Sequence, residues 1–132
     1  MTLIEQVAKY LQDTLSLGTL GTDIFIGYLP DSPDSAIAVM DTGGLEPDVH
    51  IPTKKPTFQV FIRDVNYDDG KAVLDAVRSG LHNKFPGNST TGLLVAGGTS
   101  IMNMFAMAEG GHIGRDEVGR DLFSINFRCM TR

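Results

Sequence analysis

The sequence predicts an α+β fold, in which a largely antiparallel sheet of four to five strands carries two helices packed on one face. Two stretches, residues 2–15 and 67–83, have apolar residues at helical spacing, and the segments around them alternate with the period of a strand. The expected order is therefore helix, three strands, helix, two strands. With 132 residues, we expect a single domain over residues 1–132 with its own hydrophobic core.

The first helix is predicted over residues 2–15. Thr2 and Glu5 have the spacing of a capping box, in which each side chain satisfies a backbone amide at the start of the helix. Gly18 and Gly21 are expected to end the helix and to form the turn that follows. Its apolar residues share one face; they are Leu3, Ile4, Val7, Ala8, Leu11 and Leu15.

Three strands are expected next. β-Branched and aromatic residues predict strands at residues 23–28 and 36–40, separated by a turn rich in Pro and Asp. Residues 45–56 contain three prolines and no periodic pattern, so we expect a long connection outside the sheet. The third strand, at residues 57–63, alternates, and its core face is formed by Phe58, Val60 and Ile62.

The second helix is predicted from Tyr67 to about Asn83. Asp68 and Asp69 stand in its first turn, where the positive end of the helix dipole favours carboxylates, and Lys84 lies at the opposite end. His82 is expected to be an exposed residue of this helix.

Two further strands are predicted at residues 99–108 and 121–130, preceded by a loop at residues 85–98. The last strand alternates most regularly, and its expected core residues are Phe123, Ile125, Phe127 and Cys129. Residues 109–120 are too many for a tight hairpin, so we expect a long loop there. Three irregular segments of this length are unusual in one small domain, and they suggest a subunit that its neighbours complete.

The charge is acidic and unevenly distributed. Sixteen Asp and Glu oppose 11 Lys and Arg, which gives a formal net charge of −5, and no Lys or Arg occurs between Lys9 and Lys54. The seven acidic residues in that stretch are either solvated loop residues or a face that attracts or repels a charged partner. Net acidity argues against a protein that wraps duplex DNA. We also expect no membrane segment and no signal peptide, and the single cysteine fits a reducing compartment.

The chain lacks the residue patterns that mark common catalytic and metal sites. His50, His82 and His112 are too widely spaced for a metal-ligand signature, and no cysteine pair accompanies them. The glycine-rich residues 110–115 precede a strand and not the helix that a phosphate-binding loop requires. We therefore predict no catalytic, metal-binding or cofactor-binding residue, and a binding or assembly protein rather than an enzyme.

Residues 28–39, together with Asp41-Thr42-Gly43-Gly44 and the strand at 58–63, resemble the minor capsid or tail terminator proteins of long-tailed bacteriophages. The resemblance implies a ring-shaped homo-oligomer, with a hexamer expected, that caps the tail tube, stops its polymerisation and joins the tail to the head connector protein. DNA would pass through the channel without sequence-specific binding. The expected location is the head-proximal end of the virion tail, after assembly in the host cytoplasm, with no cofactor.

Contact residues of this assembly are expected in the acidic segment and in the connection before the last strand. The candidates are Asp31, Asp34, Asp41, Glu46, Asp48, His112, Arg115, Asp116, Glu117 and Arg120. Two alternatives stay open: a head-tail connector or stopper ring protein, and a small hydrolase or metal enzyme that uses His112, Asp116 and Glu117.

Overall fold

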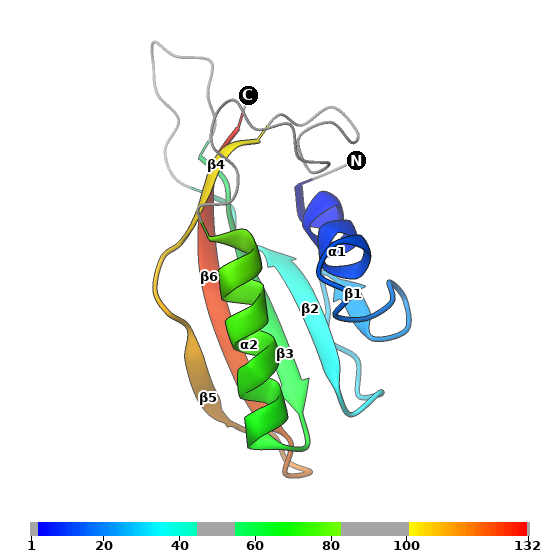
Figure 1. The fold of residues 1–132 in the computed structure, drawn as a ribbon. Helices are drawn as coiled ribbons and strands as arrows, with labels where there is room; N and C mark the ends of the chain where they lie inside the picture. The colour runs from blue at the N-terminus through cyan, green and yellow to red at the C-terminus, as the bar shows by residue number, and fades with distance from the viewer. Residues whose placement is uncertain (1–2, 45–54, 83–100, 132) are drawn as a thin grey trace.

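The predicted α+β class and the placement of both helices on one face of the sheet are confirmed. A computed structural model describes residues 3–44, 55–82 and 101–131. Figure 1 shows helices α1 and α2 side by side over the same face of one sheet. In chain order the elements are α1 (Leu3–Asp13), β1 (Ile24–Ile26), β2 (Ala36–Asp41), β3 (Thr57–Asp64), α2 (Tyr67–Leu81), β4 (Ile101–Ala106), β5 (Gly111–Arg115) and β6 (Asp121–Thr131).

The strands follow the order β1-β2-β3-β6-β4, and β5 also pairs with β6. All pairs are antiparallel except β1 with β2, which is parallel. Parallel neighbours need a connection that returns along the strand. Because β1 has only three residues, residues 27–35 are enough to carry the chain back to the start of β2.

The sheet has six strands rather than the four to five predicted, because part of the segment 109–120 is not a loop. Residues Gly111–Arg115 form β5 and pair with the first half of β6. The register shifts between His112 and Gly114, and Gly114 has a φ of +128°. A bulge that depends on a left-handed glycine interrupts the alternation of side chains, so this strand leaves no period-two pattern in the sequence.

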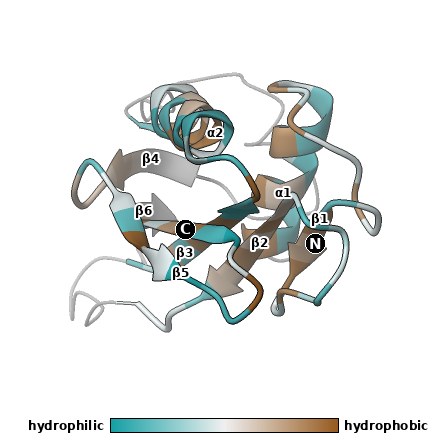
Figure 2. Cartoon of the chain, turned by 90° about the horizontal axis from the view of Figure 1, so that it is seen from below, coloured by the Kyte–Doolittle hydropathy of each residue, from teal (hydrophilic) through white to brown (hydrophobic). Residues whose placement is uncertain are grey.

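The core lies between the helices and the central strands β3 and β6. Phe58 pairs with Phe127 across the two strands, and their rings stack with centroids 5.1 Å apart. Figure 2 shows both helices on the same side of the sheet, above strands that carry hydrophobic residues. The predicted core faces are correct: the three residues named on β3 and the four named on β6 are all buried.

Helix α1 ends differently from the prediction. Its last residue is Asp13, and Ser16 takes a left-handed conformation with a φ of 55°, while the Leu17 N–H donates to the Leu11 carbonyl at 3.0 Å. This bond reaches six residues back, one more than the 6→1 bond of a Schellman motif, and it closes the end of the helix around Ser16. The glycines Gly18 and Gly21 therefore lie beyond the helix end, and the proposed capping residue Thr2 lies outside the described residues.

Helix α2 is capped by a residue that the sequence analysis did not name. The Asn66 side chain accepts hydrogen bonds from the backbone N–H groups of Asp68 and Asp69, at 2.9 and 3.3 Å. At the other end the helix stops at Leu81. His82 is exposed, as predicted, but its Nδ1 accepts the backbone N–H of Ala106 at 2.9 Å and so links the end of α2 to β4.

Several predictions fall on residues 45–54 and 83–100, which lie outside the described residues. They are most of the connection at 45–56, the last residue of the second helix with Lys84, the loop at 85–98 and the start of the strand at 99–108. In the part of the chain that the structure describes, no helix is long and apolar enough to cross a membrane.

Gly70→Ala tests how tightly α2 packs on the sheet. A Cβ at Gly70 would lie 2.4 Å from the ring of Phe123, which is fully buried. Alanine normally stabilises a helix by about 1 kcal/mol relative to glycine, but overpacking costs more here. We expect a net loss of roughly 1–2 kcal/mol in urea unfolding.

Gly80→Ala is the matched control on the same helix. A Cβ at Gly80 would lie 2.5 Å from Cδ1, 2.7 Å from Cδ2 and 3.1 Å from Cγ of Leu15, and this half-buried side chain can rotate away. We expect this variant to be as stable as the wild type or more stable. Equal destabilisation by both substitutions would contradict the close contact of Gly70 with Phe123.

Cys129 should be unreactive in the folded protein. It is buried on β6, and burial raises the pKa of its thiol to about 12, so almost no thiolate forms near neutral pH. We expect a disulfide reagent such as Ellman's reagent to label the protein only after unfolding in guanidinium chloride. The variant Cys129→Ser with Ser79→Cys, which carries its thiol at an exposed position of α2, should react at once.

Candidate functional site: a charged hollow at one end of the sheet

A hollow of about 710 Å³ lies at the end of the sheet where β3 ends and β6 begins. Three segments far apart in the sequence form it: the β1–β2 connection, the end of β3, and the turn between β5 and β6. Its lining combines charged and apolar side chains, namely Leu29, Asp31, Asp34, Arg63, Asp116, Glu117, Val118, Arg120 and Leu122.

The β5–β6 turn is held by the side chain of Asp116. Its Oδ1 accepts the backbone N–H groups of Val118 and Arg120, at 3.1 and 2.9 Å. Gly119 takes a left-handed φ of +87°, and its N–H donates to the Asp116 carbonyl. An Asp that bonds the backbone ahead of it, followed by a left-handed glycine, stabilises a tight turn. The position of Arg120 is fixed as a result.

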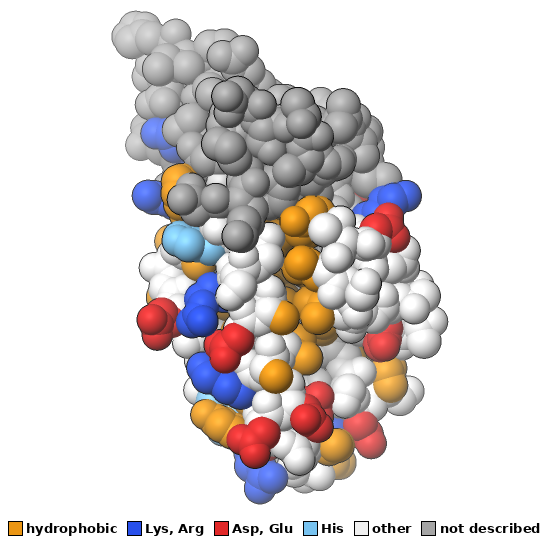
Figure 3. All heavy atoms as spheres, viewed as in Figure 1, with side chains coloured by type: hydrophobic (Ala, Val, Ile, Leu, Met, Phe, Trp, Pro, Cys, Tyr) orange, Lys and Arg blue, Asp and Glu red, His pale blue; other side chains and the backbone are white. Residues whose placement is uncertain are grey.

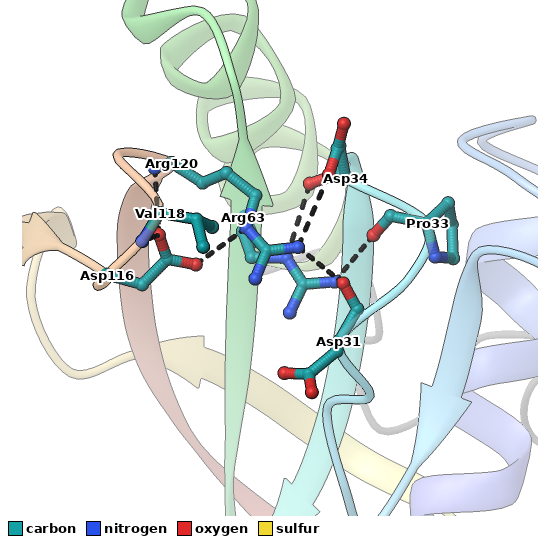
Figure 4. Close-up of polar contacts among 7 residues, drawn as sticks. All are labelled: Asp31, Pro33, Asp34, Arg63, Asp116, Val118 and Arg120. Carbon is teal, nitrogen blue, oxygen red and sulfur yellow. Dashed lines mark hydrogen bonds and ion pairs between the residues drawn. The ribbon is translucent and has the colours of Figure 1, made fainter.

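Arg120 joins this turn to the β1–β2 connection. Its Nε donates to Asp116 Oδ2 at 2.7 Å, and its Nη1 donates to the carbonyl of Asp31 and lies 3.3 Å from Asp34 Oδ1 (Figure 4). The residue is only 8% exposed. A charge that is this buried must be paired. Arg120 is paired with Asp34, which lies 86 residues away in the sequence, so the arginine joins two distant segments.

Arg63 holds the same connection from β3. Its Nε donates to the Asp34 carbonyl at 3.2 Å and its Nη2 to the Pro33 carbonyl at 2.5 Å (Figure 4). Arg63 is 4% exposed and projects from the sheet face opposite the helices, since its neighbour Ile62 faces the core. Both arginines line the hollow.

The surroundings shift two pKa values in the hollow. Burial lowers the pKa of Arg63, the nearby charge of Arg120 lowers it further, and Asp116, Asp31 and Asp34 act in the opposite direction. Desolvation alone would raise the pKa of Asp116. The hydrogen bonds from the backbone and side chain of Arg120, its positive charge and the backbone N–H of Val118 outweigh this, so the pKa of Asp116 lies below its ordinary value.

A second charged group lies beside the hollow, around Asp121. His112 Nε2 lies 2.9 Å and Arg115 Nε lies 3.3 Å from Asp121 Oδ1. The His112 ring also packs edge-on against Tyr67 and Phe123, with centroids 5.3 and 5.2 Å apart. These contacts attach β5 to the start of β6 and to the first turn of α2.

The structure brings together half of the predicted contact residues. Asp31, Asp34, Asp116, Glu117 and Arg120 line the hollow. His112 and Arg115 belong to the neighbouring group.

The remaining predicted residues lie elsewhere. Asp41 lies at the opposite end of β2, where it accepts the N–H of Gly43, while Glu46 and Asp48 lie outside the described residues. The sequence analysis did not select Arg63 or Asp121. In the sequence, each of them appears only as a charged residue at one end of a strand in which hydrophobic and polar residues alternate.

The residues of the enzyme hypothesis are divided between the hollow and the group around Asp121. His112 pairs with Asp121, whereas Asp116 pairs with Arg120, so the residues of the enzyme hypothesis do not form one catalytic group. Among residues 3–44, 55–82 and 101–131, no three metal-ligating side chains come together. The hollow is instead a charged surface whose two arginines are held by hydrogen bonds and ion pairs within the protomer.

Comparison with known families agrees with the resemblance seen in the sequence. The model of a family described as bacteriophage tail terminator protein matches residues 10–131, which includes every strand and all of α2. The chain belongs to the bacteriophage tail terminator family. No curated protein matches its sequence. The terminator family is structural and not enzymatic, and it implies a place in the virion tail and an interaction with the tail tube.

Asp116 should stabilise the terminator in a pH-dependent way. Asp116→Asn keeps an acceptor for the turn but removes the charge beside Arg120, and Asp116→Ala removes both. At pH 7 we expect the midpoint temperature of thermal unfolding to be lower for Asp116→Asn than for the wild type, and lower still for Asp116→Ala. Because the folded-state pKa is lowered, the charge stabilises above the unfolded-state pKa, and this stabilisation disappears as the pH falls through the folded-state pKa.

The difference in midpoint between wild type and Asp116→Asn should therefore shrink between about pH 5 and pH 2. Asp41→Asn, at the other end of β2, is the control for loss of one exposed carboxylate. A difference for Asp116→Asn that stays constant over this pH range would show that the charge is not stabilising.

Proposed function

We propose that this tail terminator assembles, as a single domain over residues 1–132, into a ring that caps the tail tube. The ring stops polymerisation of the tube and joins the tail to the head connector protein, and a hexamer is the expected stoichiometry. The observation that carries the proposal is the family match over residues 10–131, because it spans nearly the whole fold and not one motif.

The sheet offers edges through which neighbouring protomers can associate. In the described part of the chain, β1 forms one edge, and β4 and β5 share the other, each pairing with a different part of β6. Edge strands present backbone groups that can pair with another chain. A contact between two different surfaces of the same protomer closes into a ring when its rotation matches the symmetry.

The charge of the protomer suits a ring through which DNA passes. Carboxylates repel phosphates, so an acidic protein gives little non-specific affinity for DNA. The contacts within the ring or with its partners would involve the predicted acidic residues and the β5–β6 hairpin. They include Asp31, Asp34, Asp41, Glu46, Asp48, His112, Arg115, Asp116, Glu117 and Arg120.

Sedimentation equilibrium and negative-stain microscopy test this proposal. We expect ring-shaped particles with a mass of about six times the 14.3 kDa of one chain, either for the protein alone or after mixing with tail tubes. On tubes, the particles should occupy one end and stop further growth. Protein that stays monomeric and does not bind tube ends would overturn the proposal, and rings that bind only the connector would identify a stopper protein instead.

A further inference from the structure

The whole net charge of the terminator is found at one end of the sheet. We define the acidic end as residues 29–35, 63–69 and 113–122. These segments adjoin because Asp121 of β6 pairs with both β3 and β5. Arg63 and Arg120 in addition contact Asp34 in the first segment. These segments contain eight carboxylates and three guanidinium groups, a formal charge of −5, which equals that of the entire chain. Elsewhere in the chain, eight acidic and eight basic residues balance.

The charge that reaches solvent at the acidic end is almost entirely negative. Arg63 and Arg120 are buried and satisfied within the protomer, so Arg115, with 62% of its side chain exposed, is the cation that remains at the surface of these segments. Figure 3 shows acidic side chains at this lower end of the molecule, with hydrophobic ones among them. The exposed carboxylates belong to Asp31, Asp34, Asp68, Asp69 and Glu117.

Apolar side chains are also concentrated at the acidic end. Of the six large hydrophobic residues that are exposed among the described residues, four lie there; they are Val65, Tyr67, Ile113 and Val118, with 48% to 72% of their surface accessible. Val118 also lines the hollow, with Leu29 and Leu122. Exposed apolar groups rimmed by polar ones are typical of protein–protein contact surfaces.

The charge decides between possible partners. DNA is disfavoured because phosphates and carboxylates repel each other. A second copy is disfavoured because the rest of the chain is neutral overall and offers no complementary excess of positive charge. The surface instead fits a different protein that presents Lys and Arg side chains around an apolar centre.

We propose that the acidic end is the surface through which the terminator binds the end of the tail tube, by contact with basic and apolar side chains of the tube subunits. This inference rests on the proposed function, because it identifies the surface by which the ring caps the tube. The hydrogen bonds of Arg63 and the ion pairs of Arg120 hold the three segments in place before the partner arrives, so little ordering is needed on binding.

Removal of exposed charge tests the inference directly. The triple variant Asp68→Asn, Asp69→Asn, Glu117→Gln removes three carboxylates from the acidic end and leaves the Arg120 pairs intact. Its matched control, Glu5→Gln, Asp13→Asn, Glu109→Gln, removes three exposed carboxylates from other segments. Both variants change the net charge equally, and circular dichroism establishes that both are folded.

Binding to tubes assembled from the tail tube protein is measured at low and high salt. We expect the triple variant to bind roughly tenfold more weakly at low ionic strength, with a difference that narrows as salt screens the charges. The control should bind like the wild type. Val118→Ser should weaken binding at all salt concentrations, whereas Met107→Ser, which truncates an exposed hydrophobic residue outside the acidic end, should not.

Three results would overturn the inference. Both triple variants could weaken tube binding equally, or the acidic-end variant could bind tubes as the wild type does. The acidic-end variant could also keep tube binding and lose ring formation or connector binding instead. Wild-type protein that forms no rings and binds no tube ends would instead overturn the proposed function itself. The two failures are thus distinguishable in one set of measurements.

Discussion

The antiparallel pairing of β3 with β6 is the contact on which the rest of the structure depends. It runs from Thr57 and Arg128 to Asp64 and Asp121, and β2, β4 and β5 all attach to one of these two strands. One face of the pair provides the phenylalanines of the core, on which α2 packs. Where the pair ends, Arg63 and Asp121 become the anchor points of the charged groups. Register in this pair therefore sets both the core and the charged hollow, since a shift by one residue would exchange the two faces of each strand.

The parts of the fold that could be predicted are those in which side-chain periodicity records burial. The core faces of β3 and β6 and the apolar stripe of α1 are of this kind, because one side of each element is buried. The strand β5 was missed because glycines and a bulge interrupt its alternation, and the end of α1 was missed because Ser16, not a glycine, takes the left-handed conformation. Both depend on backbone geometry that leaves a weak trace in residue types.

The site was only half predictable, because closeness in sequence is not closeness in space. The acidic run from Asp13 to Asp48 suggested one surface, but β2 carries its members apart: Asp34 lies at one end of that strand and Asp41 at the other. The acidic end is instead assembled from three segments that are distant in sequence. Arg63, which organises it, could not be distinguished from an ordinary outward-facing residue until the connection that covers it was seen.

The contact between Arg120 and the β1–β2 connection also bears on how the protein folds. It joins residues that are 86 and 89 positions apart in the sequence. Contacts between such distant residues slow folding, because a long loop must close before they can form. The acidic end therefore exists as one surface only in the folded protomer, because its three segments are far apart in the sequence and adjoin through these contacts.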